Sequence, residues 1–186
     1  FFLLAQNAFA DTSMSPDGWL DLGFGDQGVT TIDVDDSSEE RARAMVVTDD
    51  YIVVTGVGGF GDEPFCYTVL MDHDGEVLDT AEKRHSSDLY EYNCKAIAID
   101  GDDIYISGTV TYTTSSTEAT FVLKYTIDND ELTDEDYGDS TFSSTDVSIT
   151  TNLIHDGYLY SGGSKSDDLF MEKWNMSTLG RSKTYD

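Results

Sequence analysis

The sequence predicts an all-β protein built from repeated units of about fifty residues. Two apolar runs around an acidic turn span residues 44–56, and the same arrangement recurs 52 positions later at residues 96–108. A third, less regular copy ends at Gly162, where the first two copies end at Gly56 and Gly108. A repeat of this length is typical of proteins whose small structural units stack against one another. No segment shows a sustained helical period, so we expect no long helix.

Each unit is expected to contain four strands. In the first unit the strands lie near residues 43–48, 51–57, 65–71 and 76–81, with turns at residues 49–50 and 73–75. Valine, isoleucine, tyrosine and threonine dominate these stretches, as is typical of strands. Runs of three apolar residues within them favour strands that are buried on both faces. Antiparallel sheets stacked face to face around an axis contain such strands, because each sheet has a neighbour on both sides.

Four-stranded antiparallel units stacked around an axis are the blades of a β-propeller. The sequence therefore predicts a β-propeller-like fold with about three blades, near residues 41–93, 94–144 and 145–186. The second and third blades share an aromatic-x-x-Lys-aromatic pattern, at residues 121–125 and 170–174. Because a closed propeller needs at least four blades, we expect residues 11–186 to be an incomplete, N-terminal part of a larger propeller. Its open edge would then pair with remaining blades of the same protein or with another copy.

Residues 17–34 are expected to form a glycine-rich turn and a closing-strand segment ahead of the first blade. Residues 17–29 read Asp-Gly-Trp-Leu-Asp-Leu-Gly-Phe-Gly-Asp-Gln-Gly-Val, which resembles the Asp-Gly-x-Leu-Asp-x-x-Phe-Gly-x-x-Gly pattern of the delta-60 repeat of secreted bacterial proteins. Residues 96–108 are similar to related bacterial β-propeller repeats, including quinoprotein-type repeats. The likeness covers most of residues 17–186, and the third unit departs from it with polar residues at 150–152. The resemblance implies an extracytoplasmic propeller and carries no established catalytic residues.

Residues 1–10 are interpreted as the remnant of a secretory signal peptide. They are apolar and end in Ala8-Phe9-Ala10, the small-x-small pattern that signal peptidase leaves, followed by polar residues from Asp11 onward. The alternative is a buried N-terminal strand or short helix. Cleavage after Ala10 would give an extracytoplasmic location: secreted, periplasmic or on the cell surface. No other segment reaches the roughly 18 apolar residues that a membrane span needs, so we expect no membrane insertion.

The chain is strongly acidic, with 37 acidic and 10 basic residues and a formal net charge of −27. Such a charge excludes nucleic acid as a partner, because phosphate backbones are bound through lysine and arginine. It also opposes adsorption to anionic lipid. The simplest alternative to a functional role for this acidity is solubility in a salty habitat. Strand direction places the first and third turns of each unit at one end, where we expect these aspartates to gather: Asp49, Asp50, Asp72, Asp74, Asp100, Asp102, Asp103, Asp128, Asp130 and Asp156.

No motif in the sequence indicates a cofactor or a dedicated metal site. Residues 56–61 satisfy G-x-G-x-x-G, but Pro64 and a strand follow where a nucleotide site needs a helix, so a loop is expected. The acidic residues 72–76 suggest calcium, but a hairpin turn explains their Asp-Gly pair better. The three histidines, His73, His85 and His155, are scattered and lack zinc-type spacing.

The two cysteines, Cys66 and Cys94, are candidates for a disulfide. A chain exported to an oxidising compartment favours the pairing. The bond would close a loop of 28 residues and stabilise the fold by roughly 3 kcal/mol. The alternative is that Cys66, inside a predicted strand, is a buried free thiol.

Function is expected at the end of the blades opposite the acidic turns. The loops and links at this end are longer and more varied than the acidic turns: residues 58–64, 111–117, 163–168, 82–93 and 139–146. Variable loops on a rigid scaffold are where recognition concentrates. They supply Phe60, Tyr112, Tyr90 and Tyr92, a set suited to an unknown carbohydrate or protein surface. The sequence thus predicts a non-catalytic binding or structural scaffold; the alternatives are an architectural adhesin segment and a fragment of a propeller enzyme, of glycosidase or quinoprotein type, whose active-site blades are missing.

Overall fold

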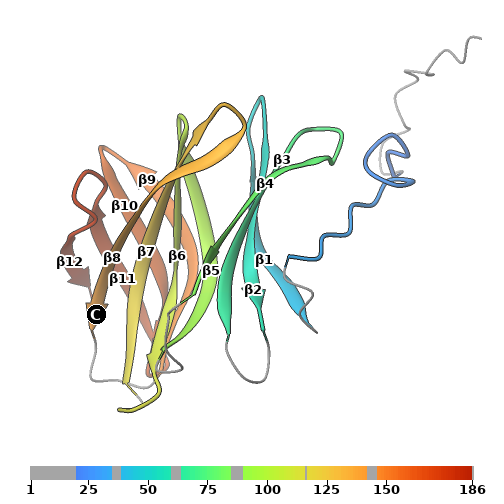
Figure 1. Ribbon diagram of the computed structural model, residues 1–186. Coiled ribbons are helices and arrows are strands. Elements are labelled where there is room, and N and C mark those ends of the chain that lie inside the picture. The colour runs from blue at the N-terminus through green and yellow to red at the C-terminus, as the bar shows by residue number, and fades with distance from the viewer. Residues whose placement is uncertain are drawn as a thin grey trace, which may run out of the picture.

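The protein is an all-β structure of three stacked antiparallel sheets (Figure 1). A computed structural model describes residues 20–34, 39–59, 64–84, 90–115, 117–141 and 146–185. These residues contain twelve strands and no helix. The predicted signal peptide at residues 1–10 lies outside them, as do Phe60 and His85. The expectation of an all-β fold is confirmed.

Each sheet is a four-stranded meander in which consecutive strands are neighbours. The first sheet contains β1 (Glu40–Val47), β2 (Ile52–Gly58), β3 (Phe65–Met71) and β4 (Val77–Lys83). The second contains β5 (Tyr90–Asp100), β6 (Asp103–Tyr112), β7 (Thr117–Asp128) and β8 (Glu131–Thr141). The third contains β9 (Val147–His155), β10 (Tyr158–Lys165), β11 (Asp168–Asn175) and β12 (Arg181–Tyr185). No sheet closes on itself within the described residues.

The sheets stack face to face with their first strands together. β5 contacts β1, β2 and β3 of the first sheet, and β9 contacts β5, β6 and β7 of the second. At the other edge β4 contacts β8, and β8 contacts β12. The second sheet therefore lies in the middle and has both faces covered, which accounts for its runs of consecutive apolar residues.

Two buried layers hold the stack together. The larger layer lies between the first and second sheets, where Leu70 and Val53 pack against Ile104, Phe121 and residues around them. Between the second and third sheets, Tyr105 and Val122 pack against Leu159 and Trp174. Alternating residues of the second sheet thus point to opposite neighbours, as the period of two along a strand requires.

The repeat is marked by a glycine that faces a β-bulge in each first strand. A Cβ atom on Gly56, Gly108 or Gly163 would lie within 2.3 Å of a main-chain oxygen of the preceding strand. The registers of β1, β5 and β9 shift at the same points. The third glycine of this series is therefore Gly163, not the Gly162 that the sequence repeat indicates. The glycine is needed where the main chain of the bulged first strand comes close, and in the third sheet that position is Gly163.

Residues 20–34 differ from the expected closing strand. They form turns and two isolated bridges, from Gly25 and Asp26 to Val29. Gly25 N donates to Asp74 O at 2.7 Å, and the Thr30 hydroxyl donates to Gly75 O at 2.9 Å. Ile32 and Val34 pack on the outer face of the first sheet. The alternating apolar pattern is therefore satisfied by contact with a sheet face, without pairing to a sheet edge.

The first and third turns of the first two sheets meet at one end, as the strand directions predict. His73 Nε2 lies 3.0 Å from Thr48 O, which joins the two turns of the first sheet. The Tyr51 hydroxyl donates to Asp130 Oδ1 of the second sheet at 2.8 Å. This end carries the β1–β2, β3–β4, β5–β6 and β7–β8 hairpins at the top of Figure 1. We call it the acidic end.

One predicted loop at the opposite end is shorter than expected. The stretch from Gly163 to Asp168 is mostly strand, because β10 continues to Lys165 and pairs there with Asp168. A two-residue turn joins the strands, with φ of 50° at Ser166 and 71° at Asp167. Two positive φ values are what the right-handed twist of a tight hairpin requires.

Candidate functional site

A tyrosine-lined pocket opens between the first and second sheets, at the end opposite the acidic end. Its volume is about 490 Å³, within the usual range of small-ligand sites. It is lined by Lys83, Arg84, Tyr90, Tyr92, Tyr112, Tyr137 and Asp139. We call it the tyrosine pocket.

Strand pairing brings the aromatic rings together. Tyr90 and Tyr112 are register partners on β5 and β6, and their rings meet edge to face with centroids 5.1 Å apart. Tyr92 lies two residues along β5, so it shares the face of Tyr90. Its ring lies 5.5 Å from Phe121 and 6.3 Å from Tyr137 of β8. The tyrosines form one continuous surface that is anchored in the core through buried Tyr92 and Phe121.

A disulfide fixes the two walls of the pocket against each other. Cys66 of β3 and Cys94 of β5 are bonded, with Cα atoms 5.4 Å apart. Cys94 is two residues from Tyr92, and Tyr92 N donates to Pro64 O at 3.1 Å. The bond therefore joins the first and second sheets close to the aromatic surface, which limits how far the two sheets can separate there.

The cations at the pocket are already paired with acids. The Lys83 ammonium donates to Glu135, and Arg84 Nε donates to Glu82 Oε2 at 2.6 Å. Lys83 also lies over the Tyr137 ring, 5.1 Å from its centroid, and Arg84 lies 3.5 Å from the centroid of Phe65. With Asp139 also among the lining residues, the pocket has no surplus of positive charge. Its chemistry suits a neutral, polar ligand better than an anion.

Two of the pocket tyrosines, Tyr92 and Tyr137, have a raised pKa and stay protonated over the physiological range. Burial raises the pKa of Tyr92, and the neighbouring phenols and Asp139 act on it further. Burial also raises the pKa of Tyr137, together with the charges of Tyr92 and Asp139. A neutral phenol can both donate and accept a hydrogen bond, so these rings can bind hydroxyl groups as well as apolar surface.

Three of the four predicted ligand-face residues lie in this pocket. Tyr90, Tyr92 and Tyr112 come together, and Phe60 is outside the described residues. Sequence reasoning missed Lys83, Arg84 and Tyr137. Tyr137 belongs to an aromatic-glycine pair that looks like a repeat marker, and β8 carries it to the pocket.

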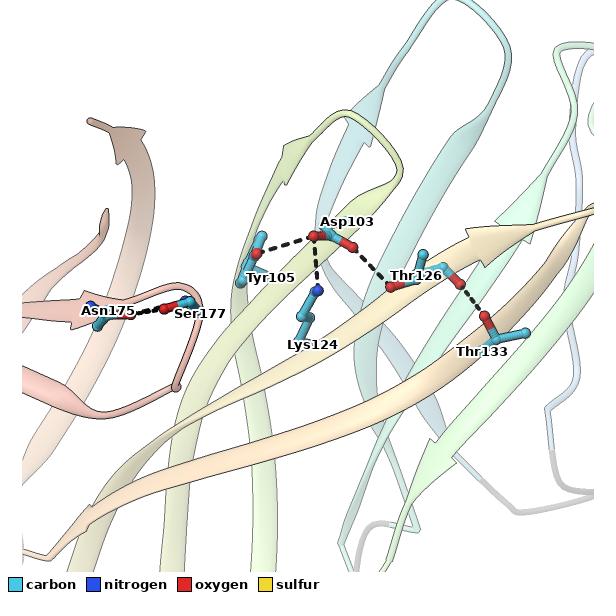
Figure 2. A network of polar contacts seen from close by, with 7 residues as sticks. All are labelled: Asp103, Tyr105, Lys124, Thr126, Thr133, Asn175 and Ser177. Carbon is cyan, nitrogen blue, oxygen red and sulfur yellow. Dashed lines mark hydrogen bonds and ion pairs between the residues drawn. The ribbon is translucent and has the colours of Figure 1, made fainter. Parts of the chain in front are cut away.

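The acidic end offers no comparable site among the described residues. Asp72 Oδ1 accepts from Asp74 N at 3.0 Å and from Glu76 N at 2.8 Å, so this carboxylate shapes its own hairpin. Figure 2 shows Asp103 held by Lys124 at 2.8 Å, with Thr126 and Tyr105 donating to it. Within the part of the chain that the structure describes, no group of three His, Cys, Asp or Glu side chains could hold a metal ion.

No protein-family model matches the chain, and no curated protein matches it. The site is therefore interpreted from its own geometry. The Gly56–Gly61 motif begins on β2, and the next described element after it is strand β3. In the ranges that the structure covers, no helix is long and apolar enough to cross a membrane.

Proposed function

We propose that this chain is a non-catalytic carbohydrate-binding module of a secreted or surface-associated β-propeller, with the tyrosine pocket as its binding site. The observation that carries the proposal is the convergence of Tyr90, Tyr92, Tyr112 and Tyr137 on one pocket whose cations are already paired. Sugar rings have apolar C–H faces and polar hydroxyl edges. Tyrosine rings offer an apolar surface for the first and a hydroxyl group for the second.

Two features support binding over turnover at this pocket. Lys83 and Arg84 each hold a glutamate, so neither is poised as a base or an anion clamp. A propeller glycosidase would need two carboxyl groups across the scissile bond, whereas Asp139 is the one acid among the lining residues. A protein surface is the second ligand class, because tyrosines are also common in protein interfaces.

The stacking of the sheets supports the β-propeller architecture. Three consecutive meanders each place their first strand at one common edge and their last strand at the other. This is the arrangement of propeller blades around an axis. A closed ring needs further blades, which the same protein or another copy would provide.

The outer face of the third sheet supports the expectation of further blades. Leu169 and Met171 occupy the positions of Cys66 and Thr68 in the first sheet, because Gly163 pairs with Phe170 as Gly56 pairs with Tyr67. Cys66 is 1% exposed because the second sheet covers it, whereas Leu169 is 86% exposed. Leu153 of β9 is 65% exposed on the same sheet. A face with buried counterparts in both preceding sheets is the face on which a fourth sheet would pack.

An extracytoplasmic location fits the disulfide. Disulfides persist in oxidising compartments and are rare in the reducing cytosol. The Cys66–Cys94 bond lies in the core between two sheets, where it has a structural role.

A glycan-binding measurement tests the proposal. The chain is screened on a glycan array, and hits are measured by calorimetry for the parent, Tyr90→Ala and Tyr112→Ala. Each variant should lose roughly two- to twelvefold in affinity, since an aromatic contact contributes roughly 0.5–1.5 kcal/mol beyond its buried area. Tyr51→Ala, at the acidic end, is the matched control and should bind like the parent.

Three outcomes would contradict the proposal. Equal loss in Tyr51→Ala would show that folding, not the pocket, was affected. Undiminished glycan binding in both pocket variants would place the site elsewhere. Release of shortened glycans on incubation with the parent would instead favour the propeller-enzyme alternative.

A further inference from the structure

The β-bulges of the first strands bring two basic residues to equivalent positions. In β1 the register skips Arg43, between Ala42 and Ala44, and in β5 it skips Lys95, between Cys94 and Ala96. In β9 the skipped residue is Thr150. A bulge leaves its extra residue outside the strand ladder and redirects its side chain. Because β1 contacts β5, Arg43 and Lys95 lie on adjoining strands at the edge where the sheets converge.

These two cations lack an acidic partner in the part of the chain that the structure describes. Other described arginine and lysine side chains have ion pairs or ring contacts: Arg41 with Glu39, Lys83 with Glu135, Arg84 with Glu82, Lys124 with Asp103, Arg181 with Glu172 and Lys173 with Tyr158. No ion pair is formed by Arg43 or Lys95 with a described acid. The chain has 37 acidic residues, and yet Arg43 and Lys95, which lie on adjoining strands, form no ion pair with a described acid.

The two charges act on each other. Burial lowers the pKa of Lys95, and the nearby positive charge of Arg43 lowers it further. Two neighbouring like charges, one of them partly buried, raise the free energy of the empty arrangement. A bound negative charge between them would remove that repulsion.

The surroundings add a phenol and one acid. The Tyr67 hydroxyl lies over Gly56, 2.5 Å from where a Cβ atom would be, and Gly56 faces the β1 bulge. Both Arg43 and Glu40 act on the Tyr67 phenol, whose pKa is raised first by burial. The Tyr67 hydroxyl can therefore donate a hydrogen bond beside Arg43, and Glu40 is the acid that opposes an anion there.

We propose that Arg43 and Lys95 form an oxyanion-binding site at the convergent edge of the first two sheets. The ligand group would be a carboxylate, sulfate or phosphate, because a guanidinium offers two parallel donors to such a group and an ammonium adds a point charge. The site is separate from the tyrosine pocket and does not depend on it. Thr150 leaves the third bulge uncharged, so the site belongs to the first two sheets alone.

Titration with three probes tests the site. Sodium sulfate, sodium phosphate and sodium acetate are added at constant ionic strength, and binding is followed by the NMR shifts of the Arg43 Nε–H and the Lys95 amide. The order of affinities identifies which oxyanion the site prefers. Arg43→Gln and Lys95→Gln should each weaken the preferred anion by about tenfold, the effect of one charged hydrogen bond.

Arg41→Gln is the matched control, since it removes the same charge from the same strand, at a residue paired with Glu39. It should change affinity less than about twofold, whereas Glu40→Gln should strengthen binding. In the free protein, Arg43→Gln should also raise the pKa of Lys95, which checks the proximity without any ligand. Equal effects of Arg41→Gln and Arg43→Gln, or shifts spread over the surface in all variants, would overturn the proposal.

Discussion

The two interfaces between the sheets are built from different chemistry. The first and second sheets meet through apolar side chains and the Cys66–Cys94 bond, and the buried polar side chains of the first sheet are the threonines Thr55 and Thr68. The second and third sheets meet through smaller apolar clusters and a buried polar layer. Members of that layer are Ser107, Thr120, Asn152, Ser161 and Glu172. One repeat can therefore stack on the next either by packing alone or by directed hydrogen bonds.

Glu172 is the centre of the polar interface. It has 0% exposure, accepts from the Thr120 hydroxyl at 2.5 Å and pairs with Arg181 at 3.4 Å. By register with the repeat glycines, its counterparts are Val69 in the first sheet and Leu123 in the second. The third sheet thus carries a buried carboxylate where the other two carry an aliphatic side chain.

The largest expected effect comes from truncating this carboxylate. Glu172→Ala removes an acceptor that Thr120 and Arg181 share and empties the volume of a fully buried side chain, which should cost about 2–5 kcal/mol. Glu172→Leu, which introduces the residue of position 123, should cost far less because it fills the volume and lets Arg181 reach solvent. Urea unfolding of the three proteins measures the difference. Equal losses for both variants would show that the lost carboxylate contacts, not packing, control the stability of this interface.

The disulfide gives the second largest expected effect. Replacing both cysteines by alanine should lower the free energy of unfolding by roughly 3 kcal/mol, for a bond that closes 28 residues. The first and second sheets should then separate more readily near the tyrosine pocket. Urea unfolding with and without reductant checks this, since reductant should destabilise the parent and leave the double variant unchanged. If reductant left the free energy of unfolding of the parent unchanged, the Cys66–Cys94 bond would be contradicted.

Buried hydroxyls provide a finer contrast between the two interfaces. The Thr55 hydroxyl donates to Tyr67 O at 2.8 Å, whereas Ser161 Oγ is buried with no partner among the described groups. Thr55→Val should therefore cost about 1 kcal/mol, and Ser161→Ala should be neutral or slightly stabilising. Thermal and urea unfolding of both variants distinguish the two cases. A similar loss for both would mean that an internal water satisfies Ser161.

The sequence predicts the regular parts of this molecule better than its exceptions. Period-two patterns and Asp-Gly turns place the strands of the first sheet to within a few residues, because side-chain alternation and positive φ are local properties. The tyrosines of β5 and β6 are predicted to share an end for the same reason. Tyr137 and Glu172 cannot be found this way, since their environments depend on which sheet lies opposite. The polar stretch at residues 150–152 is the local signal that the interface between the second and third sheets differs, and Asn152 does accept from the Ser107 hydroxyl at 2.6 Å.

The smallest expected effect concerns Asp103 and Tyr105 of β6, at the acidic end of the second sheet and near the third sheet. Burial opposes ionisation of Asp103, but hydrogen bonds from Lys124 and Thr126 outweigh it and lower its pKa below 3.8 (Figure 2). A lowered carboxyl pKa stabilises the fold above the unfolded value, and this contribution is lost as pH falls through the folded pKa. In Asp103→Asn the free energy of unfolding should fall less on acidification than in the parent. The difference should be below about 1 kcal/mol, because the Asp103–Lys124 pair is partly exposed. Urea unfolding between pH 5 and about pH 2 tests it.

The Asp103 carboxylate should also affect stability at alkaline pH, where stability is lost as pH rises. Burial, followed by the charge of Asp103, raises the pKa of Tyr105 from 10.0 to about 12. A raised phenol pKa contributes stability that is complete below 10.0 and is lost as pH rises toward about 12. Asp103→Asn removes the second cause and leaves the first, so the Tyr105 pKa should fall part of the way back toward 10.0. Ultraviolet titration of the phenols, compared with a Tyr105→Phe variant to isolate this ring, measures the change. An unchanged titration in Asp103→Asn would assign the shift to burial between the second and third sheets and to the charge of Asp100, and Asp103 would then add nothing to that interface.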